Sequence, residues 1–113
     1  MEQHYKLDRI RELADNDQEF IVTLAMTFLE EVPEDAAQLK IHAENNNYLA
    51  TYKTAHKMKP TIELFDLGVY NELIEVQDWG KFEQTDKDIS QQLQIVISAV
   101  EKATQEIKED FNL

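Results

Sequence analysis

The chain has 113 residues and a formal net charge of −12, with 23 acidic side chains against 11 basic ones. This length suffices for one domain with its own hydrophobic core, and a hydrophobic content of 42% is typical of a globular protein rather than a disordered one. The absence of cysteine excludes disulfide bonds and thiolate metal sites, and the acidic balance argues against nucleic acid or an anionic membrane as a partner. With only two glycines and two prolines, helices are favoured over a loop-rich β protein.

The first residues carry no apolar stretch of the kind that forms a signal peptide, and no segment approaches 18 consecutive apolar residues. No composition shift or linker divides the chain, so residues 1–113 are expected to form a single helical domain. We expect this domain to be cytoplasmic and monomeric.

The first half of the chain predicts two helices. Leu7 to Ala14 forms a short amphipathic segment, and Asn16 with Glu19 three residues later resembles a capping box that opens a longer helix. Apolar residues then keep one helical phase to about Glu44, namely Ile21, Ala25, Phe28, Val32, Ala36, Leu39 and Ala43. Because this phase continues across Pro33, one long kinked helix is favoured over two separate helices.

The second half predicts three more helices. Asn47 can cap a helix that runs to about Phe65, and after a break a shorter helix ends at Gly80. Thr85 with Asp88 at the third following position begins the last helix. Its apolar residues alternate four and three apart, as in the seam of a bundle: Ile89, Leu93, Val96, Val100, Ala103, Ile107 and Phe111. The predicted fold is all-α, an antiparallel four-helix bundle with a short additional N-terminal helix.

One histidine lies in a part of the chain that contains no acid. Residues 45–62 are 18 residues without Asp or Glu, whereas an even spread of the 23 acids would place about four there. On a helix, the expected core face consists of Tyr48, Tyr52, Ala55, Met58, Ile62 and Phe65. His56 points roughly 110° from the middle of that face, so the imidazole is expected to reach solvent, with an ammonium group one turn away. These surroundings predict an anionic group as the partner of His56.

The residues around His56 resemble a known family. Ala55-His-Lys-Met-Lys59 is similar to the His-x-Leu-Lys signature of histidine-containing phosphotransfer (HPt) domains. Phe28-Leu-Glu-Glu-Val-Pro-Glu34, followed by Leu39 and Ala43, resembles the helix that precedes this signature, and the likeness extends roughly over residues 20–100. The family usually has glycine where Pro60 stands, and glycine or another small residue near Asp66.

The resemblance implies that His56 is a phosphoacceptor and that Lys59 steadies the phosphoryl oxygens. It implies a phosphorelay carrier that receives phosphate from the receiver domain of a hybrid sensor kinase and passes it to the receiver of a response regulator. A neutral imidazole near pH 7 is a competent nucleophile for this task. The sequence has no nucleotide-binding pattern and no converging metal ligands, so no cofactor is expected here and Mg²⁺ is expected in the receiver.

A receiver is expected to dock on the residues around His56 on its helix: Tyr52, Lys53, Lys57, Pro60 and Glu63. Lys57 points ~100° away from His56, so it is expected to act mainly on the encounter rate. The alternative function is a helical adaptor that keeps the bundle and the docking face without the chemistry. His42 is expected to be an ordinary surface residue, and His4 is expected to lie in a frayed terminus.

Overall fold

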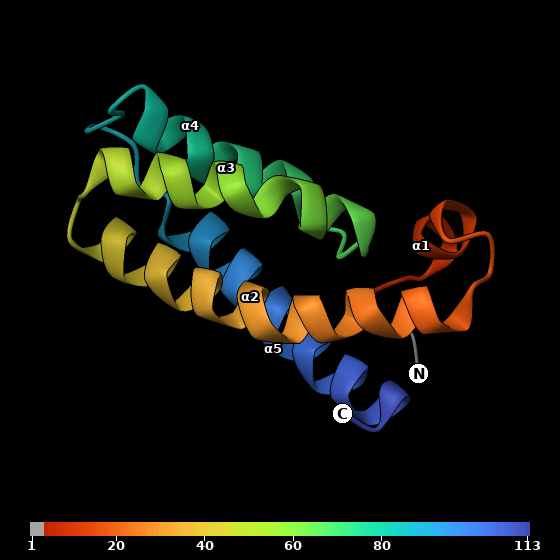
Figure 1. Cartoon of the computed structure of the whole chain (residues 1–113). Coiled ribbons are helices and arrows are strands. Elements are labelled where there is room, and N and C mark those ends of the chain that lie inside the picture. Colours follow the sequence, from red (N-terminus) through yellow and green to blue (C-terminus); the bar gives the residue numbers. More distant parts are fainter. Residues whose placement is uncertain (1–3) are drawn as a thin grey trace.

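The computed structural model describes residues 4–113, and this part of the chain forms five α-helices (Figure 1). Their bounds are Asp8–Leu13 for α1, Gln18–Glu44 for α2, Tyr48–Leu64 for α3, Tyr70–Lys81 for α4 and Ser90–Phe111 for α5. Helix α2 packs against α3 and α5, and α4 packs against the same two helices. The four long helices therefore close into an antiparallel bundle, and the short α1 lies at one end of it (Figure 1). The predicted fold class is confirmed.

Helix α2 is continuous through Pro33, as the unbroken apolar phase predicted. Its buried residues are the seven of the predicted core face. Its start differs from the prediction, because the N-cap is Asp17, whose side chain accepts a hydrogen bond from the amide of Glu19 at 3.1 Å. An N-cap needs an extended backbone, which Asp17 has, whereas Asn16 has a φ of 60° in the preceding turn. The predicted Asn16 cap is therefore wrong by one residue.

The last helix begins later than predicted. Helix α5 starts at Ser90, whereas Thr85 lies in a turn where its amide donates to the carbonyl of Glu83 at 2.8 Å. Asp88 stands before the helix, and its Oδ1 accepts from the backbone amide of Ser90 at 2.9 Å. The indole nitrogen of the buried Trp79 donates to the carbonyl of Lys87 at 3.0 Å and holds this loop against α4. Helix α4 also extends one residue past Gly80, which was predicted to end it.

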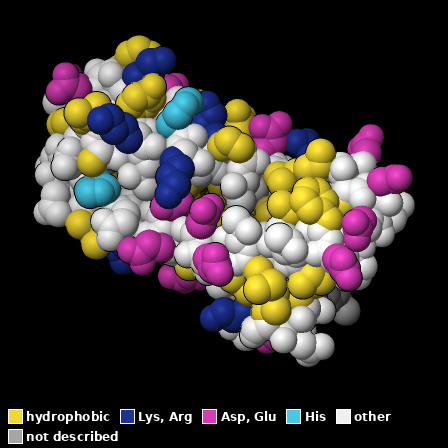
Figure 2. Space-filling model, in the orientation of Figure 1, with side chains coloured by type: hydrophobic (Ala, Val, Ile, Leu, Met, Phe, Trp, Pro, Cys, Tyr) yellow, Lys and Arg dark blue, Asp and Glu magenta, His cyan; other side chains and the backbone are white. Residues whose placement is uncertain are grey.

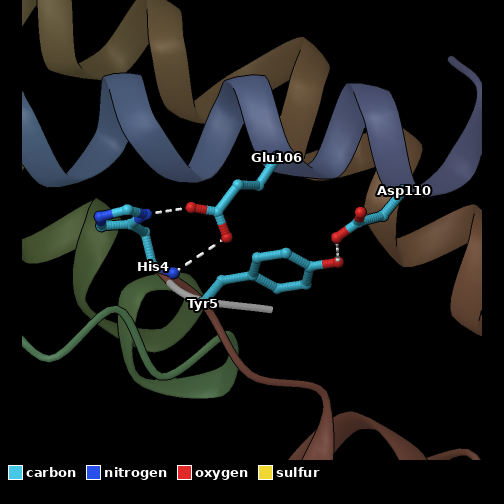
Figure 3. Close-up of polar contacts among 4 residues, drawn as sticks. All are labelled: His4, Tyr5, Glu106 and Asp110. Carbon is cyan, nitrogen blue, oxygen red and sulfur yellow. Dashed lines mark hydrogen bonds and ion pairs between the residues drawn. The ribbon is translucent and has the colours of Figure 1, made fainter. Parts of the chain in front are cut away.

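The segment before α1 is attached to the bundle (Figure 3). The His4 amide donates to Oε1 of Glu106 at 2.9 Å, and Nδ1 of the same histidine pairs with Oε2 of that carboxylate. The Tyr5 hydroxyl donates to Oδ2 of Asp110 at 2.8 Å, and the tyrosine is only 1% exposed. The prediction that His4 lies in a frayed terminus is wrong, because burial of the neighbouring Tyr5 ring fixes this segment against α5.

In residues 4–113, no helix combines the length and the apolar character needed to cross a membrane.

Candidate functional site

The core face of α3 matches the prediction at Ala55, Met58, Ile62 and Phe65, which are buried, and differs from it in the first turns of the helix. Its buried residues are Thr51, Ala55, Met58 and Ile62. Tyr48 and Tyr52, predicted for the core, are only half-buried, and Thr51 takes their place with its hydroxyl donating to the carbonyl of Asn47 at 2.8 Å. That hydrogen bond satisfies the buried hydroxyl within the helix. Asn47 also caps α3, as predicted, because its Oδ1 accepts from the amide of Ala50 at 3.2 Å.

Helix α4 passes very close to the first turns of α3. A Cβ atom added to Gly80 would lie 2.5 Å from the carbonyl oxygen of Tyr48 and 2.8 Å from the amide nitrogen of Tyr52, so only glycine allows this approach. The Tyr48 ring packs on Trp79 of α4 with ring centroids 4.5 Å apart. The two tyrosines therefore lie along the border between α3 and α4, which explains why they are not in the centre of the bundle.

His56 lies in the middle of α3 with an exposed side chain, as predicted. The ring of Tyr52, one turn earlier, lies 5.8 Å from the imidazole between centroids, at an interplanar angle of 35°. Within residues 4–113, no hydrogen bond or ion pair engages the His56 side chain. Its lone pair is therefore open to solvent and to an incoming electrophile.

Two lysines flank the imidazole along the helix. Lys53 precedes His56 by three residues and is exposed, and Lys59 follows it by three residues and is half-buried. Residues three apart on a helix are surface neighbours, so both ammonium groups lie within reach of a group bound to the imidazole. In the described part of the chain neither lysine has a carboxylate partner, so their charge is available to a bound anion.

Lys57 has a different position. Its Nζ lies 3.1 Å from Oδ1 of Asp35 on α2, and this hydrogen bond and the Asp35 charge raise the pKa of Lys57 above its usual 10.5, with a smaller effect from Glu31. Residues 45–62 contain no acid, but Asp35 and Glu31 of the neighbouring α2 lie beside them in the folded structure. Asp35 was missed by sequence reasoning, because nothing in the chain order shows which turn of α2 faces Lys57.

The remaining two predicted docking residues lie further along α3. Glu63 pairs with Arg9 of α1, with 3.2 Å between Oε1 and the guanidinium nitrogen, and both side chains are about half exposed. Pro60 is exposed, and α3 continues past it to Leu64. Since proline has no N–H, it donates no hydrogen bond to the carbonyl of His56 four residues earlier.

On the face of the molecule that carries His56, basic and acidic side chains lie on different helices. Figure 2 shows lysine or arginine side chains and a histidine over α3, with aspartate and glutamate side chains along the neighbouring α2. In residues 4–113, no group of three or more His, Asp or Glu side chains is arranged to hold a metal ion. Among the described residues, the arrangement around His56 thus offers one exposed nucleophile and two lysines without a carboxylate partner.

Comparison with protein-family models, with curated proteins and with solved structures finds no match to this chain.

Proposed function

We propose that this chain is a histidine phosphotransfer module that carries a phosphoryl group on His56. The observation that supports this most is the exposed imidazole, which has no partner among residues 4–113 and is placed between Lys53 and Lys59 on a bundle helix. In a protein with a net charge of −12, unpaired cations beside a nucleophile favour an anionic substrate at that point.

The chemistry needs little from the chain itself. An imidazole nitrogen attacks the phosphorus of an aspartyl phosphate, a P–N bond forms, the P–O bond breaks, and the aspartate leaves as a carboxylate. Transfer to the second receiver is the reverse reaction on another aspartate. Phosphoryl transfer depends mainly on positioning and on stabilisation of the phosphoryl oxygens, which is the role proposed for Lys59. The receiver domain supplies the Mg²⁺.

In this role the chain is a cytoplasmic monomer that works between two receiver domains, one in a hybrid sensor kinase and one in a response regulator. Tyr52, Lys53 and Pro60 form the part of the docking face nearest His56. Lys57 and Glu63 lie at its edges and form ion pairs with Asp35 and Arg9.

The test is uptake of phosphate by the purified chain from a phosphorylated receiver domain and, separately, from phosphoramidate. The wild-type chain is expected to take up a label that is labile in acid and stable in alkali. His56→Gln should fold normally and take up none, and His42→Gln is the matched control that should label like the wild type. An adaptor without the chemistry would bind the receiver and remain unlabelled, which would overturn the proposal.

A further inference from the structure

The orientation of the exposed His56 side chain decides how often its imidazole meets a phosphoryl donor in line. Within residues 4–113, no hydrogen bond or ion pair engages this side chain. An exposed side chain without such contacts changes rotamer on the picosecond to nanosecond timescale. Because phosphoryl transfer depends mainly on the alignment of the attacking atom with phosphorus, every rotamer that turns the imidazole away lowers the rate.

The ring of Tyr52 is the neighbour that can restrict these rotamers. Its centroid lies 5.8 Å from that of the imidazole, with the two ring planes tilted by 35°. This separation is within the range in which tilted aromatic rings attract each other. Side chains on a helix also lean towards its N-terminus, onto the residue four positions earlier, which for His56 is Tyr52. The contact therefore favours the rotamers in which the imidazole lies against the tyrosine ring.

Tyr52 is itself held in place by α4. The tyrosine is half-buried at the border between α3 and α4. A Cβ atom added to Gly80 would lie 2.8 Å from the amide nitrogen of Tyr52 and 3.2 Å from its Cβ, so the two helices touch at this residue. The backbone and Cβ of Tyr52 cannot shift towards α4. The imidazole thus lies against a ring whose position is set by the packing of two helices.

A neutral ring also suits the charge that develops on the imidazole. When one ring nitrogen attacks, a P–N bond forms, the bond from phosphorus to the donor breaks with its electron pair on the donor, and the other ring nitrogen keeps its proton. The imidazole therefore gains positive charge. A further ammonium group against the ring would oppose this charge, whereas an uncharged tyrosine does not. Lys53 and Lys59 suit the phosphoryl oxygens, and Tyr52 suits the imidazole.

We propose that Tyr52 is a positioning residue for His56, and that its ring holds the imidazole in the orientation from which it attacks phosphorus. This inference depends on the proposed function of His56. It gives Tyr52 a role within the chain itself, in addition to its contact with a docked receiver, and this role operates even with a donor too small to dock.

The test uses phosphoramidate as the donor, because a molecule of this size does not need the docking face. Initial labelling rates and melting temperatures are measured for the wild type, Tyr52→Phe and Tyr52→Leu. Tyr48→Leu is the matched control, since Tyr48 is also a half-buried tyrosine of α3 but its ring packs on Trp79, with the centroids 4.5 Å apart.

Tyr52→Leu is expected to slow labelling about three- to tenfold, the effect of losing one aromatic contact that aligns the nucleophile. Tyr52→Phe keeps the ring and should label at the wild-type rate. Tyr48→Leu should also label at that rate, even where its melting temperature falls as far as that of Tyr52→Leu. In proton NMR spectra, the imidazole resonances of His56 should move in Tyr52→Leu, because the ring current of the tyrosine is lost, and should stay in place in Tyr48→Leu.

The outcomes separate the two claims. Labelling of Tyr52→Leu at the wild-type rate would overturn the positioning role and leave the phosphoacceptor role of His56 intact. Equal slowing in Tyr48→Leu would also overturn it, since the loss would then follow the stability of α3. Slow labelling of Tyr52→Phe would show that the hydroxyl is needed rather than the ring, which contradicts the proposal. A wild-type chain that takes up no label would overturn the proposed function and this inference together.

Discussion

The Nζ atom of Lys57 lies 3.1 Å from Oδ1 of Asp35, so the lysine that directly follows His56 in the chain is joined to α2. Within residues 4–113, Lys53 and Lys59 are the two lysines beside the imidazole that have no carboxylate partner. Lys57 is therefore joined to α2 by a surface ion pair, whereas Lys53 and Lys59 are available to a bound anion.

Asp35→Asn is expected to lower the pKa of Lys57 toward 10.5, because the hydrogen bond and the charge of Asp35 are what raise it. A raised pKa in the folded state means that the pair stabilises the fold fully below pH 10.5 and that this contribution disappears as the pH rises through the folded value. Titration of the lysine Nζ by NMR in both proteins measures the shift. The same lysine pKa in wild type and Asp35→Asn would show that the ion pair does not form in solution.

Lys59→Ala is expected to slow transfer by about 10- to 100-fold, since one charge-assisted contact to the phosphoryl oxygens is lost in the transition state. Lys57→Ala is the matched control, because its ammonium group is already paired with Asp35 and should affect only the encounter rate and its dependence on salt. Quenched single-turnover assays of transfer from the phosphorylated chain measure the rates of both variants. If Lys59→Ala transfers at the wild-type rate, this lysine has no part in the site.

Tyr5→Phe is expected to lower the free energy of unfolding by about 1 kcal/mol, because the hydroxyl loses its hydrogen bond to Asp110. Tyr5→Ala should cost roughly 3–5 kcal/mol, since the ring is buried. Tyr70→Phe serves as the control, because Tyr70 is 37% exposed at the surface of α4. Urea denaturation measures all three, and a Tyr5→Ala variant as stable as the wild type would mean that the segment before α1 is not attached to the bundle.

Gly80→Ala is expected to destabilise the protein by about 1–3 kcal/mol, because the added methyl would lie 2.5 Å from the carbonyl oxygen of Tyr48. In an ordinary helical position the same change stabilises by up to ~1 kcal/mol, so the sign of the effect is itself the test. A higher melting temperature for Gly80→Ala would show that α3 and α4 are not in such close contact.

The helices with a strong apolar period were predictable from the sequence. The seven residues of the α2 core face keep one phase, and all seven are buried in the helix that packs against α3 and α5. Asn47 was likewise predictable as a cap, since the interaction is with a backbone amide three residues later. The exposure of His56 followed from its angle on the helix.

The features that depend on contacts between helices were not predictable. Thr51 replaces the tyrosines in the core because Gly80 lets α4 approach the start of α3, and no local pattern contains that contact. The start of α5 is set by the loop that Trp79 holds, which competes with the capping pattern at Thr85. Asp35 was also not predictable as the partner of Lys57, because their contact depends on the packing of α2 on α3.

The most direct test of the central claim is the location of the phosphate. The chain is phosphorylated with phosphoramidate, digested at alkaline pH so that phosphohistidine survives, and analysed by mass spectrometry of its peptides. We predict one phosphoryl group per chain, on the peptide that contains His56, and no uptake by His56→Gln. Phosphate on His4 or His42, or an equal level of labelling in His56→Gln, would contradict the account.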